Sequence, residues 1–116
     1  MADVLVDTDV LIDHLRAQRV FEPGGDRVHY SVLTRAELFA GRASAEGVIQ
    51  TLLSPFREID VGRRIAEEAG RIRRATQIPL PDAVIAATAT ILGLTLLTRN
   101  RRDFERVPGL KLRAPR

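Results

Sequence analysis

The sequence predicts an α/β domain in which a mostly parallel β-sheet is covered by helices on both faces. Short apolar runs of strand length alternate with longer segments whose apolar residues recur at helical spacing. The 116 residues suffice for one such core, so a single domain over residues 1–116 is expected. The composition, 45% hydrophobic and 28% charged with no cysteine, is typical of a globular domain and excludes disulfides and thiolate sites.

The amino-terminal half begins with a strand that leads into a helix. Val4-Leu5-Val6 is a short apolar run before a polar turn, and the apolar residues that follow it recur at helical spacing. A Pro-Gly-Gly sequence then breaks the chain. The predicted elements are, in order, a strand at 4–6, a helix at 10–16, a loop at 21–27, a strand at 28–32 and helices at 33–43 and 48–53.

The carboxyl-terminal half continues the alternation. One predicted helix places apolar residues on one face and arginines on the other, and the next is apolar nearly all round, as a buried helix would be. The predicted elements are a strand at 56–61, helices at 62–76 and 82–93, and a strand at 94–98. Because a helix joins each strand to the next, parallel pairing is expected.

Acidic and amide side chains lie near the ends of these predicted strands. Asp7 ends the first strand, and Glu37 lies one turn into the helix after the second. Asp82 opens the helix that leads into the last strand, which Asn100 and Asp103 follow. Parallel sheets bind ligands beyond the carboxyl ends of their strands. We therefore expect these side chains to meet at one edge of the sheet.

Each acid also has an ordinary structural explanation. Asp7 or Asp9 could cap the first helix. Thr34-Arg35-Ala36-Glu37 fits a capping box, in which Glu37 reaches back to the Thr34 amide. Asp82 could complement a helix dipole, and Asp103 could begin a turn. Both kinds of explanation remain open from the sequence.

Several carboxylates at one site are suitable ligands for a divalent cation. Magnesium prefers oxygen ligands and keeps several waters, so one or two direct carboxylates with further acids around them suffice. Two ions about 3.5 to 4 Å apart could activate a water and stabilise the leaving oxygen of a phosphodiester. This chemistry needs no histidine, and we interpret His14 and His29 as ordinary side chains.

Charge is distributed unevenly along the chain. Residues 1–60 carry 10 acidic and 6 basic side chains, whereas residues 61–116 carry 5 and 12. A basic half beside an acidic cluster suits a protein that binds a polyanion, although arginines on a helix can equally be a solvated face. The longest uncharged stretch has 16 residues and the start lacks a basic region, so we expect no membrane segment, no signal peptide and a cytoplasmic location.

Four segments place these acids in a specific context. They are Val4-Leu5-Val6-Asp7-Thr8-Asp9-Val10-Leu11-Ile12-Asp13, Leu33-Thr34-Arg35-Ala36-Glu37-Leu38, Pro81-Asp82-Ala83-Val84-Ile85-Ala86-Ala87-Thr88-Ala89 and Leu97-Thr98-Arg99-Asn100-Arg101-Arg102-Asp103-Phe104. Together they resemble PIN-domain ribonucleases, and specifically the VapC toxins of bacterial type II toxin–antitoxin systems. The resemblance spans residues 4–104 and implies a PIN-like fold.

The resemblance implies a role for each acid. Asp7 and Asp82 correspond to aspartates on which PIN domains bind Mg²⁺, for which Mn²⁺ is a possible substitute. Glu37 matches the family's middle acid. The expected catalytic residues are Asp7, Glu37, Asp82 and Asp103.

Three further positions in these segments support or modify the implied site. Thr98 matches the hydroxyl residue near the metal. Many PIN domains have aspartate where this chain has Asn100, so Asp103 is the alternative fourth ligand. Asp9 stands where serine or asparagine is common, and it adds one charge near the site.

RNA cleavage by metal-activated water, leaving 5′-phosphate and 3′-hydroxyl ends, is the activity that the resemblance implies. Arg99, Arg101 and Arg102 flank the expected site and are the candidates for RNA contacts. The arginines at 63, 64, 71, 73 and 74 could contact RNA or an acidic antitoxin segment. With four Phe, one Tyr and no Trp, the chain has few platforms for stacking bases, so recognition of RNA shape is expected.

The implied partners are a VapB-type antitoxin and a second copy of the chain. The antitoxin would cover or disorder the site, giving a toxin–antitoxin hetero-oligomer. The apolar faces of 10–15 and 33–43 are candidates for the homodimer contact.

Three other classes share parts of this pattern. Asp7-Thr8-Asp9-Val10 matches the opening of haloacid-dehalogenase-type phosphatases, but the only lysine, Lys111, is near the end and no Asp-Asp pair occurs. A response-regulator receiver could use Asp60 as phosphoacceptor, but it requires two neighbouring acids after the first strand. The third is a non-catalytic PIN-like module that binds RNA or protein.

Overall fold

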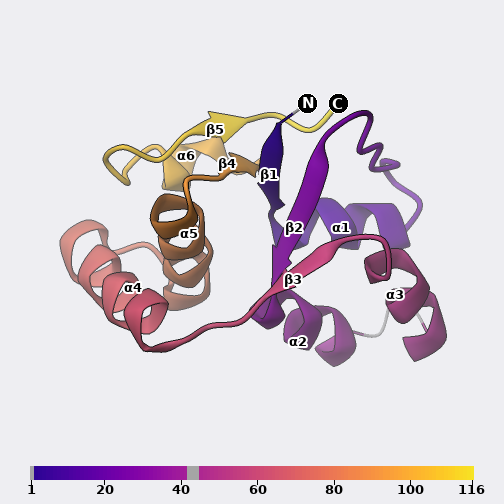
Figure 1. The fold of residues 1–116 in the computed structure, drawn as a ribbon, viewed down its shortest axis with the longest axis horizontal. Helices are drawn as coiled ribbons and strands as arrows, with labels where there is room; N and C mark the ends of the chain where they lie inside the picture. Colours follow the sequence, from indigo (N-terminus) through magenta and orange to yellow (C-terminus); the bar gives the residue numbers. More distant parts are fainter. Residues whose placement is uncertain (1, 42–44) are drawn as a thin grey trace.

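The centre of the molecule is a five-stranded sheet with the order β3-β2-β1-β4-β5, in which every pair is parallel. This computed structural model describes residues 2–41 and 45–116. Helices α4 and α5 pack on one face of the sheet, and α1, α2 and α3 lie on the other side (Figure 1). The predicted α/β class, with a mostly parallel sheet between helices, is confirmed.

Strands and helices follow one another in the predicted order. Their bounds are β1 Asp3–Val6, α1 Thr8–Leu15, β2 Arg27–Ser31, α2 Val32–Ala40, α3 Glu46–Leu53, β3 Arg57–Ile59, α4 Arg63–Thr76, α5 Leu80–Leu92, β4 Thr95–Leu97, α6 Arg101–Phe104 and β5 Leu112–Arg113. The helix predicted over 33–43 ends at Ala40, and the predicted positions 42 and 43 lie outside the described residues.

Two short elements near the carboxyl terminus were not predicted. Helix α6 is a single turn of four residues, and β5 consists of two residues that pair with β4 at the edge of the sheet. Neither is long enough to show an apolar period in the sequence. Helix α6 is important for the site because it carries Asp103.

Strand β1 is buried on both faces. Because successive side chains of a strand point to opposite faces, Val4 and Val6 pack against α1, α2 and α3, whereas Leu5 packs with α4 and α5. All three side chains are 0% exposed. Burial on two sides explains why this run is continuously apolar, as in other parallel sheets.

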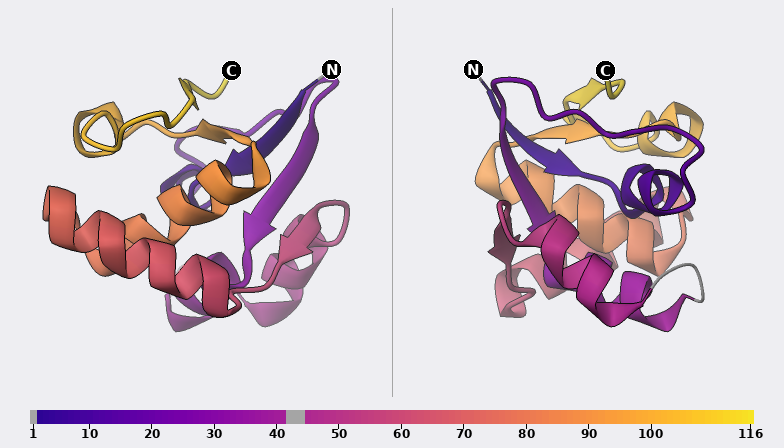
Figure 2. Two further views of the ribbon diagram at one scale, coloured as in Figure 1. Left: turned by 60° about the vertical axis from the view of Figure 1, so that its left-hand side comes forward. Right: turned by 90° about the vertical axis from the view of Figure 1, so that its right-hand side faces the viewer.

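The direction in which the sheet grows reverses at β1. Strands β2 and β3 lie on one side of it, and β4 and β5 on the other. Such a reversal opens a crevice beyond the carboxyl ends of the two central strands, β1 and β4. Helices α1 and α6, which follow these strands, lie on the same side of the molecule in the right-hand view of Figure 2. The topology therefore brings residues after Val6 and Leu97 together.

Helices α4 and α5 are joined by a sharp bend. Gln77 ends α4 in the left-handed conformation, and Pro79 precedes α5. Within the described residues, no single helix is long and apolar enough to cross a membrane. Only α4 and α5 together reach the required length and composition, and they are bent by 119°.

Candidate metal centre

Asp7 is the first residue beyond β1, and its side chain is held by a residue beyond β4. Its N–H donates to the Leu97 carbonyl at 2.9 Å, which continues the pairing of the two strands. Thr98 Oγ1 donates to Asp7 Oδ2 at 2.8 Å, and the same hydroxyl accepts the Asn100 N–H at 2.9 Å. Asp7 stands at the N-cap of α1 but makes no side-chain capping hydrogen bond. Capping therefore does not explain this carboxylate.

Glu37 is also oriented by hydroxyl groups. Thr8 Oγ1 donates to Glu37 Oε1 at 2.8 Å, and this leaves Thr34 to donate to Thr8 across 2.9 Å. Helix α2 is capped by Ser31, whose hydroxyl accepts the Leu33 N–H at 3.1 Å. A capping box would require Thr34 to be the N-cap, but the N-cap of α2 is Ser31, three residues earlier. The capping-box explanation for Glu37 is therefore wrong.

Asp82 lies in the first turn of α5 and is half-buried. Burial raises the pKa of its carboxyl above the ordinary value, and the charges of Asp9, Asp103 and Glu37 raise it further. Charges act in this way only over short distances in a protein. The structure thus brings acids from α1, α2, α5 and α6 to one edge of the sheet.

Asp7 is 4% exposed, and burial is the largest cause of the shift in its pKa. Removal from water raises the pKa of Asp7 to about 7, the Thr98 hydrogen bond opposes this, and the charges of Asp9 and Asp82 add to it. Asp7 is therefore a carboxyl whose ionisation is unfavourable in the folded protein until a positive charge is nearby.

These acids have no cationic partners within the described part of the chain. Asp3, Asp13 and Asp26 each pair with an arginine. No such ion pair is formed among the described residues by the members of the acidic cluster, which we define as Asp7, Asp9, Glu37, Asp82 and Asp103. A divalent cation would supply the missing positive charge, and every donor in the cluster is an oxygen, as Mg²⁺ prefers.

The acidic cluster is gathered but does not form a closed ligand set. In residues 2–41 and 45–116, no three Asp, Glu or His side chains converge as they would around a metal with three protein ligands. Magnesium needs only one or two direct carboxylates because it keeps several waters. The donor set therefore fits Mg²⁺ better than it fits zinc, which takes at least three protein ligands.

Asn100 and Asp103 act as a pair. Asn100 Nδ2 donates to Asp103 Oδ2 at 3.2 Å, and Asp103 is the member whose charge reaches Asp82. The single turn of α6 folds Asp103 back toward Asn100, three residues earlier. The negative charge at this corner thus comes from Asp103, with the amide as its hydrogen-bond donor.

The three predicted RNA-contact arginines lie in different surroundings. Arg99 Nη1 donates to Asp13 Oδ2 at 2.9 Å, and Arg101 pairs with Glu105 at 3.3 Å on the exposed side of α6. Arg102 is exposed and forms no ion pair with a described residue. Of these three arginines, Arg99 and Arg102 each border a hollow that also contains a member of the acidic cluster, and Arg101 lines neither of these two hollows.

Sequence reasoning missed the roles of two buried threonines. Thr8 is 5% exposed and Thr34 is 0% exposed, and together they form the hydrogen-bond chain to Glu37. The available signal was spacing, since Thr34 and Glu37 are three residues apart and so share one face of α2.

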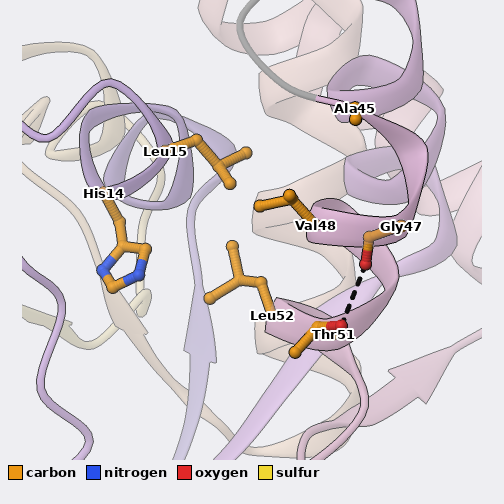
Figure 3. Close-up of a pocket in the computed structure, with 7 residues that line it drawn as sticks. All are labelled: His14, Leu15, Ala45, Gly47, Val48, Thr51 and Leu52. Carbon is orange, nitrogen blue, oxygen red and sulfur yellow. Dashed lines mark hydrogen bonds between the residues drawn. The ribbon is translucent and has the colours of Figure 1, made fainter.

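The histidines lie outside the acidic cluster and have structural partners. His14 Nδ1 accepts the Phe21 N–H at 3.0 Å, and His29 Nε2 lies 3.3 Å from Asp3 Oδ1 at the opposite end of the sheet. Figure 3 shows His14 beside an apolar pocket of about 580 Å³ between α1 and α3. Leu15, Val48 and Leu52 line this pocket, and no carboxylate does.

Known proteins resemble this chain over most of its length. The PIN domain family matches residues 4–110. Ribonuclease VapC10 of Mycobacterium tuberculosis is 38% identical over 120 residues, which cover 93% of this chain and 90% of the relative. Ribonuclease VapC1 of Methanocaldococcus jannaschii is 32% identical over 118 residues, which cover 94% of this chain and 85% of the relative.

A solved structure gives the same result for the fold. A chain in a toxin–antitoxin complex from Klebsiella pneumoniae superposes with a TM-score of 0.81 at 33% identity. The match covers 97% of this chain and 98% of that one. The resemblance found in the sequence is therefore confirmed, and the chain belongs to the PIN-domain family and, within it, to the VapC-type proteins.

Proposed function

We propose that this protein is a Mg²⁺-dependent endoribonuclease and the toxin of a type II toxin–antitoxin system. The observation that carries the proposal is the acidic cluster, a set of carboxylates without cationic partners among the described residues, at the switch point of a parallel sheet. The family adds the class of substrate, since the two relatives described above are ribonucleases by name.

Asp7 and Asp82 are the residues that would hold the ion. Thr98 fixes one oxygen of Asp7, which leaves the other free to coordinate. Asp9 adds negative charge at the rim, because it is exposed in the first turn of α1. Bound Mg²⁺ would make water acidic enough to act as nucleophile near neutral pH and would screen the phosphate charge.

Glu37 on α2 and Asp103 on α6 would complete the site. The Thr8 hydroxyl occupies Glu37 Oε1, so the second oxygen can orient a water or accept its proton. Asp103 is held by the Asn100 amide and supplies the fourth carboxylate. Thr8, Thr34, Thr98 and Asn100 act as positioning residues, because each acts through a carboxylate or another hydroxyl.

Cleavage of RNA with and without metal tests the proposal. The purified chain should cut bulk transfer RNA in Mg²⁺ or Mn²⁺, lose all activity in chelator and regain it when metal is restored. Mapping of the ends should give 5′-phosphates. If the chain binds this RNA but leaves it intact with either metal, it is a non-catalytic PIN-like module instead. Cleavage that persists in chelator would rule out the metal role.

Substitutions at the Asn100–Asp103 pair separate the two candidates for the fourth position. Asp103→Asn removes one of the three charges that act on Asp82, so kcat/KM should fall by about 10- to 100-fold, the effect of losing a group that supports metal ligands. Asn100→Asp places a second carboxylate next to Asp103, and the Mg²⁺ concentration for half-maximal rate should change less than in Asp103→Asn. Glu67→Gln, an exposed change on α4, is the control for loss of one charge. If the Mg²⁺ concentration for half-maximal rate changes more in Asn100→Asp than in Asp103→Asn, position 100 is the ligand.

A VapB-type antitoxin and a second copy of this chain are the proposed partners. Support for the antitoxin comes from the Klebsiella pneumoniae relative, whose structure is described as a toxin–antitoxin complex. Within the predicted contact face at 10–15, Val10 and Leu11 are 0% exposed and belong to the core, whereas Ile12 and Leu15 are partly exposed. Large apolar side chains that remain exposed include Val20, Val48, Leu80 and Leu92.

A further inference from the structure

Two hollows share Asn100 in their linings. One has a volume of about 560 Å³ and is lined by Asn100, Arg102, Asp103 and Arg106. The other, of about 420 Å³, is lined by Asp9, Ile12, Asp13, Arg16, Arg99 and Asn100. Each hollow thus combines two arginines with a member of the acidic cluster, and Asn100 is the wall that they share.

The arginines of the two hollows differ in whether a carboxylate already holds them. Asp13 holds the Arg99 guanidinium, and the side chains of this pair are 29% and 21% exposed. A guanidinium has five N–H donors, so Arg99 keeps donors for another anion while its position is fixed. Arg102 and Arg106 are exposed and form no ion pair with a described residue, so both charges are available.

This charge pattern matches a nucleic acid strand that crosses the acidic cluster. Carboxylates repel every phosphate except one that is held through a bound cation. The arginines of both hollows, each pair next to a different member of the cluster, offset this repulsion for the next phosphates along the strand, and their planar guanidinium groups suit phosphate oxygens. A ligand with one isolated phosphate would need only one of the hollows.

We propose that the two hollows are phosphate subsites for the RNA nucleotides on either side of the cleaved bond. The proposal rests on the proposed function for its choice of RNA. The hollow with Arg102 and Arg106 supplies most of the electrostatic affinity, because its two arginines face one carboxylate. The hollow with Arg16 and Arg99 fixes the direction of the strand, because Arg99 is already held.

Binding of RNA to an inactive chain tests this without depending on cleavage. The Asp82→Asn chain in chelator is titrated with fluorescently labelled bulk transfer RNA at several salt concentrations. Arg102→Gln and Arg106→Gln, each added to this background, should make the negative slope of log K against log salt shallower by about 0.7 to 0.9, the value for one lost phosphate contact. Arg57→Gln, an exposed arginine on β3, should leave the slope unchanged.

Arg101 provides a control on the same helix. Arg101→Gln should change the slope by less than half as much as Arg102→Gln, because Arg101 pairs with Glu105 and lines neither hollow. Equal effects at 57, 101, 102 and 106 would overturn the proposal in favour of general attraction. If polyglutamate of equal charge binds as tightly and depends equally on Arg102 and Arg106, the hollows accept an acidic protein segment instead. If the chain shows no Mg²⁺-dependent cleavage but these binding results hold, the proposed function fails and the phosphate subsites are retained.

Discussion

Replacing Asp7 by asparagine should abolish RNA cleavage and at the same time stabilise the metal-free protein at neutral pH. Burial raises the pKa of Asp7 to about 7, from an ordinary value of 3.8. Since one pKa unit corresponds to about 1.4 kcal/mol, keeping this carboxyl ionised in the folded protein costs roughly 4 kcal/mol. Asparagine is uncharged and can accept the Thr98 hydrogen bond, so it removes the cost and retains the contact.

The effect on stability has a definite pH dependence. Below about pH 3, Asp7 is protonated in both the folded and the unfolded chain, so parent and variant should unfold at similar temperatures. As the pH rises from about 3 to 7, the unfolded chain releases a proton that the folded protein keeps. The free energy of unfolding of the parent should therefore fall relative to that of Asp7→Asn, and the difference should be complete above about pH 7.

Thermal unfolding in chelator at about pH 3, 6 and 8 measures this difference. Asp60→Asn makes the same chemical change at an exposed position and should unfold like the parent at each pH. Added Mg²⁺ should stabilise the parent at high pH and have little effect on Asp7→Asn. A variant that is less stable than the parent at pH 8 would show that Asp7 has a structural role instead.

Asp82→Asn should reduce kcat/KM for RNA by at least about 100-fold. Loss of a metal ligand removes several kcal/mol of transition-state stabilisation, and each 1.4 kcal/mol is about tenfold in rate. The side chain is half-buried at the start of α5 and is not needed as a cap, so the fold should be retained. Folding is checked by the thermal unfolding transition, with Asp60→Asn as the matched control. If Asp82→Asn cuts RNA as fast as the parent, the ion is not held at α5.

The sequence was sufficient to predict the strands and helices that build the centre of the fold. Val4-Leu5-Val6 is apolar without interruption because both faces of β1 are covered, and the spacing in 62–76 matches α4 within one residue. Helix α5 begins at Leu80, two residues before the predicted start, because Pro81 fits the first turn of a helix. Helix α6 and strand β5 owe their existence to contacts with the rest of the domain, which local patterns do not encode.

The site was predicted as a set of residues but not as a set of contacts. Asp7, Glu37 and Asp82 follow from their places near strand ends and from the family resemblance, and their metal role remains a prediction. Whether Asp7 capped α1 or faced the crevice depended on Thr98, which is 91 residues away in the sequence. The link between Asn100 and Asp103 depended on the unpredicted turn of α6. Long-range hydrogen bonds such as these require the folded arrangement of the sheet.

Direct measurement of Mn²⁺ binding by calorimetry is the most decisive test of the acidic cluster as a metal centre. The parent should bind Mn²⁺ near neutral pH, and Mg²⁺ should compete for the same site. Binding should be lost in Asp7→Asn and in Asp82→Asn but unchanged in Asp60→Asn, and RNA cleavage should follow binding across the four proteins. Unchanged Mn²⁺ binding in the two cluster variants would show that the acidic cluster is not the metal centre. Full cleavage by a variant that binds no metal would show that cleavage does not need the metal.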